Sequence, residues 1–150
     1  MHADTRRKER FQSFESGLVL LRHALARGPE ALNSLEREGA IRRFEYCLDL
    51  AWKAAKEFLE HSGLRIAPIT PREVIRQGAA AGILADSQVW IDMLDHRNLL
   101  AHNYDGVVLV EVTDALAARY FTPWCDSGRS SRNGKWCCSV RSTSAPNCLR

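Results

Sequence analysis

Apolar residues recur every three or four positions along most of this chain, and that spacing constrains its fold more than any other feature. Over residues 4–26 the pattern forms a single stripe, made of Phe11, Phe14, Leu18, Leu21 and Leu25. Such a stripe is typical of an amphipathic helix that buries one face. Gly28 and Pro29 then stop this first helix. Residues 30–38 are polar and fit either a loop or a short helical turn.

The same spacing predicts a second helix over residues 39–62, with Gly63 as its C-terminal cap. Its apolar face consists of Ile41, Phe44, Leu48, Ala51, Trp52, Ala55 and Leu59. A third helix is predicted to begin at the segment TPRE, residues 70–73, which has a capping box and proline at the first helical position. It is expected to end near Gly82. A fourth helix is predicted to begin after Asp86 and to end before a turn at residues 103–106.

Residues 107–121 fit two interpretations. The segment VVLVEV, residues 107–112, has the composition of a strand, whereas ALAARY, residues 115–120, has that of a helix. An isolated strand would find no partner in a helical chain, so we expect a fifth helix here. The sequence therefore predicts an all-α domain of four or five helices over residues 1–124.

The net charge of +3 and the five cysteines belong mainly to the last part of the chain. Residues 1–124 carry 16 Lys and Arg against 17 Asp and Glu, while residues 125–150 carry five against one, together with four of the cysteines. We expect this basic, Cys- and Ser-rich tail to be disordered. It is either an end without selected function or an arm that binds RNA. Metal binding by its cysteines stays open.

We expect a cytoplasmic protein. No apolar run approaches the roughly 18 residues that a membrane span needs, and the first ten residues lack a signal peptide's apolar segment. Because the predicted bundle is close to neutral, any RNA or nucleotide binding there must come from a local cleft.

Arg97 lies in the middle of the predicted apolar face of the fourth helix. That face holds Trp90, Met93, Leu94, Leu100 and Ala101. A guanidinium there must pair with Asp92 or Asp95, bond a carbonyl, line a cleft or face a partner chain, because an unpaired buried charge is costly. His102 follows near the helix end, where a cation is also favoured by the helix dipole.

The segment RNLLAHNY, residues 97–104, resembles the R-x4-H-x-Y motif of HEPN domains (higher eukaryotes and prokaryotes nucleotide-binding). IRRFEYCLDLAWK, residues 41–53, resembles the RFEY…LAWK segment of one HEPN branch, the nucleotidyltransferase substrate-binding proteins, which are similar to HEPN toxins of minimal nucleotidyltransferases. TPREVIR at 70–76 and WIDML at 90–94 add to the match. The resemblance spans about residues 8–121.

This resemblance implies an up-and-down bundle of four or five helices that forms a homodimer and brings two copies of the motif into one cleft. It also implies a separately encoded minimal nucleotidyltransferase as partner. In the toxin branch it implies a metal-independent endoribonuclease that uses Arg97 and His102, with Asn98 and Asp95 in support. AMP added to Tyr104 would silence the enzyme. Two alternatives stay open: a non-catalytic module that presents a nucleotide or another substrate, and a structural dimer with a decayed site.

Glu45, Asp49 and Lys53 form a candidate pocket one helical turn apart on the second helix. A solvated edge with ion pairs between successive turns explains the same pattern. The chain has no phosphate-cradling glycine loop, so we expect that it does not itself carry the nucleotidyltransferase activity. No cofactor is expected. The histidines of the bundle lack zinc-ligand spacing, so no metal site is expected there.

Overall fold

The apolar stripes fold into five α-helices in a computed structural model that describes residues 2–120. The elements in chain order are α1 (His2–Ala24), η1 (Pro29–Ala31), α2 (Ser34–His61), α3 (Pro71–Ala80), α4 (Ser87–His102), α5 (Gly106–Ala115) and the π-helical turn η2 (Leu116–Tyr120). These residues contain no strand, so the all-α prediction is confirmed. The tail at 125–150 and its four cysteines lie outside the described residues.

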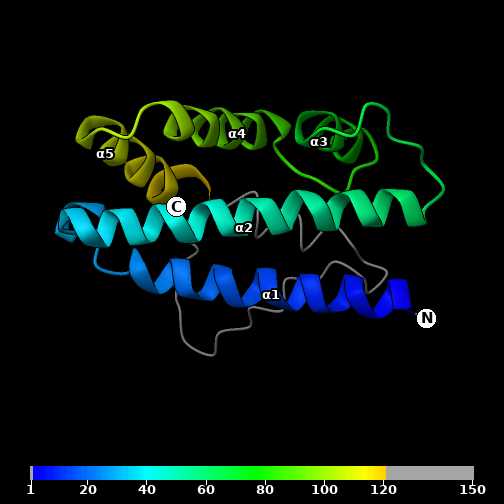
Figure 1. Cartoon of the computed structure of the whole chain (residues 1–150), viewed down its shortest axis with the longest axis horizontal. Coiled ribbons are helices and arrows are strands. Elements are labelled where there is room, and N and C mark those ends of the chain that lie inside the picture. The colour runs from blue at the N-terminus through cyan, green and yellow to red at the C-terminus, as the bar shows by residue number, and fades with distance from the viewer. Residues whose placement is uncertain (1, 121–150) are drawn as a thin grey trace.

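The long helix α2 runs through the middle of the fold. Figure 1 shows α1 along one side of α2 and α3, α4 and α5 along the other, with α3 and α4 almost in line. Arg10 of α1 pairs with Glu57 near the end of α2, while Arg43 of α2 donates to the carbonyl of Leu20 (2.8 Å). The two helices therefore pack antiparallel.

The second helix begins five residues earlier than the sequence analysis predicted. Asn33 accepts a hydrogen bond from the Glu36 backbone N–H (2.8 Å), and the Glu36 carboxylate accepts one from the Asn33 N–H (2.9 Å). This capping box satisfies backbone donors at the start of α2. The preceding polar residues form the short turn η1 and the loop between the helices, where no apolar stripe marks the boundary.

The other predicted helix starts agree with the structure. Thr70 Oγ1 accepts from the Glu73 N–H (3.2 Å), but the reciprocal bond of the predicted capping box is absent, because the Thr70 N–H donates to the Pro68 carbonyl (3.1 Å) and the Glu73 carboxylate accepts from Gln77 (3.0 Å). Asp86 is the residue before α4, in a left-handed conformation and without a side-chain cap bond. The valine-rich segment is helical: Asp105 accepts from the N–H groups of Val107 (2.9 Å) and Val108 (3.0 Å) at the start of α5.

The core lies on both sides of α2 and uses the predicted stripes. Its fully buried members include Leu18, Leu21, Phe44, Leu48, Ala51, Trp90, Met93 and Val112. Cys47 is buried, and burial raises the pKa of its thiol to about 12. The prediction that Ala101 faces the core is wrong: Ala101 is exposed, because it lies about 100° around the helix from its buried neighbour Leu100. No helix within residues 2–120 is long and apolar enough to cross a membrane.

Candidate functional site

The Arg-His-Tyr motif lies at the corner where α4 turns into α5. The N–H of Asn103 donates to the Leu99 carbonyl (2.8 Å) and closes the helix directly after His102. Arg97 is partly buried, whereas His102 and Tyr104 are exposed. The imidazole and the phenol are therefore accessible at this corner. We call Arg97, His102 and Tyr104 the motif corner.

The two acidic side chains that were candidates to neutralise Arg97 are engaged elsewhere. Asp95 pairs with Arg72 of α3 (2.5 Å). Asp92 accepts a hydrogen bond from Gln88 (2.9 Å) and pairs with Arg119, and both contacts lower the pKa of its carboxyl, Gln88 more strongly. Among residues 2–120 no hydrogen bond or ion pair engages Arg97. Its guanidinium donors are therefore unoccupied within the described part of the chain.

The predicted supporting residues do not contact the histidine. Asn98 is exposed, and within the described part of the chain its side chain makes no hydrogen bond to His102. Asp95 holds Arg72, so its contact links α4 to α3. Both residues border the motif corner, but neither orients the imidazole in this structure.

Tyr104 presents an accessible phenol beside the charged surface of α2. Its side chain is 56% exposed. Partial burial and then the nearby carboxylates of Glu38 and Glu45 raise the pKa of the phenol, while Arg42 opposes them. The phenol is therefore protonated at neutral pH. A reaction at its oxygen needs an external base.

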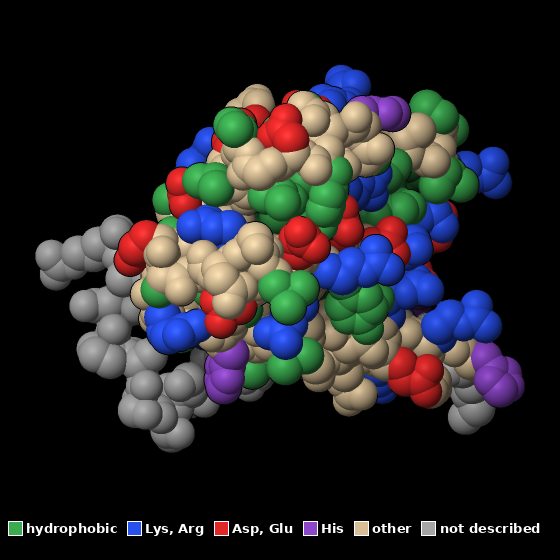
Figure 2. Space-filling view, turned by 60° about the vertical axis from the view of Figure 1, so that its left-hand side comes forward, with side chains coloured by type: hydrophobic (Ala, Val, Ile, Leu, Met, Phe, Trp, Pro, Cys, Tyr) green, Lys and Arg blue, Asp and Glu red, His purple; other side chains and the backbone are tan. Residues whose placement is uncertain are grey.

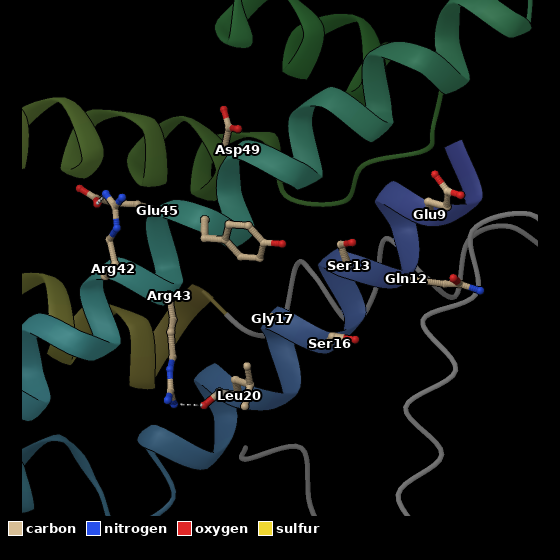
Figure 3. A pocket seen from close by; sticks show the side chains of 11 residues that line it. Glu9, Gln12, Ser13, Ser16, Gly17, Leu20, Arg42, Arg43, Glu45 and Asp49 are labelled. Atoms are coloured by element: carbon tan, nitrogen blue, oxygen red, sulfur yellow. Dashed lines mark hydrogen bonds and ion pairs between the residues drawn. The ribbon is translucent and has the colours of Figure 1, made fainter. Parts of the chain in front are cut away.

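A groove of about 810 Å³ lies between α1 and α2 (Figure 3). Helix α1 lines it with Glu9, Gln12, Ser13, Ser16, Gly17 and Leu20. Helix α2 contributes Arg42, Arg43, Glu45, Tyr46 and Asp49. Two of the three residues of the candidate pocket, Glu45 and Asp49, thus face one concave surface. Lys53 does not line the groove but binds Asp49 (2.7 Å), and Arg42 lies 3.6 Å from Glu45.

A second group of histidine, tyrosine and arginine side chains was not predicted from the sequence. The Tyr120 hydroxyl bonds Nδ1 of His96, whose Nε2 lies 3.3 Å from Glu111, and Arg119 pairs with Asp92. We call these five residues the paired cluster. Tyr120 is fully buried, and burial raises the pKa of its phenol to about 12. The cluster joins α4 to α5 and η2.

The chemistry available at the motif corner is that of a cation and an imidazole. No group of three or more His, Cys, Asp or Glu side chains within residues 2–120 is arranged to hold a metal ion. A guanidinium binds phosphate oxygens through paired hydrogen bonds. A histidine imidazole exchanges protons near neutral pH. Together they suit an anionic ligand such as a phosphodiester. Figure 2 shows acidic and basic side chains interspersed on one face of the molecule, so neither positive nor negative charge dominates that face.

An all-helical bundle with an Arg-x4-His-x-Tyr motif at the end of its fourth helix defines a HEPN-type protein. The family model described as "Nucleotidyltransferase substrate binding protein like" matches residues 9–128, and the chain belongs to this family. A relative in Haemophilus influenzae, "Probable ribonuclease HepT", is 29% identical over 70 residues. These residues are 45% of this chain and 48% of the relative, so the match spans about half of each protein.

Proposed function

We propose that this chain is the RNA-cleaving subunit of a two-protein system with a separately encoded minimal nucleotidyltransferase. The observation that carries the proposal is that Arg97, five residues before the exposed His102 on α4, has no hydrogen bond or ion pair within residues 2–120, while both neighbouring aspartates hold other partners. A satisfied Arg97 would have indicated a structural role. The name of the relative, a probable ribonuclease, supports RNA cleavage, and the family name supports the link to a nucleotidyltransferase.

Cleavage at this site requires no metal ion. The RNA 2′-hydroxyl attacks the adjacent phosphorus, the O2′–P bond forms and the P–O5′ bond breaks. The products are a 2′,3′-cyclic phosphate and a 5′-hydroxyl. An imidazole takes the 2′ proton, and an acid returns one to the leaving 5′ oxygen. Arg97 donates hydrogen bonds to the non-bridging oxygens and stabilises their growing charge.

A homodimer would complete this chemistry. One imidazole cannot take and donate a proton at the same moment, whereas two copies of His102 in one cleft could divide the roles. Large apolar side chains are exposed around the motif corner: Leu99, Val107 and Val110. Such side chains favour an interface with a second chain. We therefore propose that the dimer contact lies at the end of α4 and the start of α5.

AMP addition to Tyr104 would silence the enzyme. The phenol oxygen attacks the α-phosphorus of ATP, pyrophosphate leaves, and a base of the nucleotidyltransferase takes the phenol proton. The exposure of Tyr104 makes its oxygen accessible to that enzyme. The added group brings bulk and negative charge two residues from His102 and repels the RNA backbone.

The test is cleavage of RNA by the purified chain with EDTA present. We expect His102→Ala and Arg97→Ala each to lose cleavage, and the matched variants His61→Ala and Arg76→Ala, both exposed on other helices, to keep it. Equal cleavage by all five proteins, or none by any, removes the ribonuclease proposal. RNA binding without cleavage by the unaltered chain would favour the non-catalytic module.

The silencing is tested by co-expression with the nucleotidyltransferase and mass spectrometry. We expect one or more AMP groups on Tyr104 and lost cleavage. Tyr104→Phe should cleave RNA and stay unmodified. Absence of AMP on Tyr104 contradicts this part of the proposal.

Light scattering of the unaltered chain and of Val107→Asp tests the dimer, because a charge at that exposed valine should produce monomers.

A further inference from the structure

One face of α4 carries three exposed polar residues that lead to the motif histidine: Asp95, Asn98 and His102. Residues of an α-helix follow one another at about 100°, so Asp95 and His102 point within about 20° of each other and lie about 10.5 Å apart along the helix axis. Asn98 lies between them along the helix, about 60° around it from Asp95. We call these three residues the exposed α4 face.

Asp95 holds a guanidinium from α3 beside this face. Nη2 of Arg72 lies 2.5 Å from Oδ1 of Asp95, although the two residues are 23 positions apart in sequence. Both side chains are about half exposed, 51% for Arg72 and 57% for Asp95. An ion pair as exposed as this one contributes little to folding. Its main consequence is to fix the Arg72 guanidinium two turns of α4 away from His102.

The ion pair leaves most of this guanidinium available. A guanidinium has five N–H donors, and among residues 2–120 Arg72 uses them only for Asp95. The stretch of α4 from Asp95 to His102, taken together with Arg72, carries two guanidiniums, those of Arg72 and Arg97, against one carboxylate. The side-chain amide of Asn98 makes no hydrogen bond within the described residues. Hydrogen-bond donors and one excess positive charge thus accompany the exposed α4 face.

We propose that Arg72 binds a backbone phosphate of the RNA, two turns of α4 away from the phosphate that is cleaved at His102. The choice of RNA rests on the proposed function. An arginine that is already held in place loses less conformational freedom when it binds an anion, and its planar fork fits phosphate oxygens. Asp95 thereby prepares Arg72 for the substrate. The RNA backbone follows the exposed α4 face from His102 past Asn98 to Arg72, and an RNA too short to reach Arg72 lacks this contact.

RNA binding by the full chain carrying His102→Ala, with EDTA present, tests the inference without cleavage. The probes are a decanucleotide and a dinucleotide of adenylate, and every further variant is made in the His102→Ala chain. We expect Arg72→Gln to weaken decanucleotide binding about tenfold and to leave dinucleotide binding unchanged. The slope of log affinity against log salt concentration should fall by about 0.7, the value for one phosphate contact of a single strand. Arg72→Lys keeps the positive charge and should keep this slope.

Arg76→Gln is the matched control for Arg72→Gln. Arg76 lies one turn further along α3 and is also exposed, but it contacts a carboxylate of its own helix, Glu73 (3.4 Å), and not one of α4. It should bind both RNAs like the His102→Ala chain. Equal losses in Arg72→Gln and Arg76→Gln would reduce the effect to general charge and overturn the inference. Unchanged decanucleotide affinity in Arg72→Gln, or an equal loss for the dinucleotide, overturns it as well.

Cleavage kinetics of the chain with His102 intact give a second readout. Arg72→Gln should raise KM for the decanucleotide about tenfold and leave kcat unchanged, because the contact lies away from the reacting atoms. A fall in kcat at unchanged KM would contradict the assigned role. If the unaltered chain cleaves no RNA, the proposed function fails, and the binding measurements alone still decide whether Arg72 contacts RNA.

Discussion

The same three residue types occur twice around α4, with opposite surroundings. In the paired cluster, Tyr120 bonds His96, His96 contacts Glu111, and Arg119 pairs with Asp92. Tyr120 is fully buried. At the motif corner, Arg97 and His102 have no bonded partner within residues 2–120, and Tyr104 is exposed. The difference teaches that residue type alone does not identify a site. Polar groups bonded internally hold the helices together, whereas free polar groups are available to a ligand.

The largest effect is expected on RNA cleavage, which should depend on His102 and not on His96. His102→Ala should lower RNA cleavage about 100-fold or more, because it removes the proton-transferring group. Its folding free energy should change by less than about 0.5 kcal/mol, because the side chain is exposed. His96→Ala should do the reverse and lower stability with cleavage retained. Cleavage rates and urea unfolding of both variants measure this, and matching profiles would remove the distinction.

The next effect concerns the buried tyrosine. Tyr120 stacks on Phe44 with ring centroids 5.8 Å apart, so Tyr120→Ala should leave a cavity and cost about 3–5 kcal/mol of folding free energy. Tyr104→Ala, at the exposed motif corner, should cost less than about 0.5 kcal/mol. Urea denaturation monitored by circular dichroism compares them. Similar losses in both variants would mean that burial does not separate the two regions.

Alkaline pH should weaken the paired cluster. The pKa of Tyr120 is about 12 in the folded chain, above its ordinary value of 10.0, so folding favours the protonated phenol. Its contribution, about 2–3 kcal/mol, is complete below pH 10 and is lost as the pH rises toward 12. The pKa of Cys47 is raised from 9.0 to about 12, so the Cys47 thiol adds a further loss of folding free energy, which begins at a lower pH than the loss from Tyr120. Tyr120→Phe should flatten the stability curve between pH 10 and 12; parallel curves would contradict this origin.

Much of the fold was predictable because the core residues of each helix lie on one face. The stripes of α1 and α2 and the cap at Thr70 all appear in the structure. The start of α2 was missed because residues 30–38 carry no apolar stripe, although Asn33 and Glu36 have capping-box spacing. The valine-rich start of α5 has strand propensity that tertiary packing overrides. Ala101 is exposed because it lies about 100° around α4 from the buried Leu100.

The motif residues were predictable, but their availability was not. Whether Arg97 is free depends on which arginines bind Asp92 and Asp95. Those partners, Arg119 and Arg72, are 27 and 23 residues away in sequence. Spacing along one helix carries no information on contacts across helices. For the same reason only the α2 side of the groove, with Glu45 and Asp49, was predicted from the sequence. The residues that α1 contributes to the groove were not predicted.

The smallest expected effect concerns the turn at the motif corner, which the cap of α5 at Asp105 is expected to hold in place. Asp105 caps α5 through two hydrogen bonds directly after Tyr104, so Asp105→Ala should cost about 1 kcal/mol of folding free energy. Thr70→Ala removes the cap of α3 and should cost a similar amount. Only Asp105→Ala should also slow AMP addition to Tyr104, because it loosens the turn that presents the phenol. Unfolding curves and the rate of AMP incorporation measure both variants. An equal slowing in Thr70→Ala would attribute the effect to global stability and remove the special role of the turn.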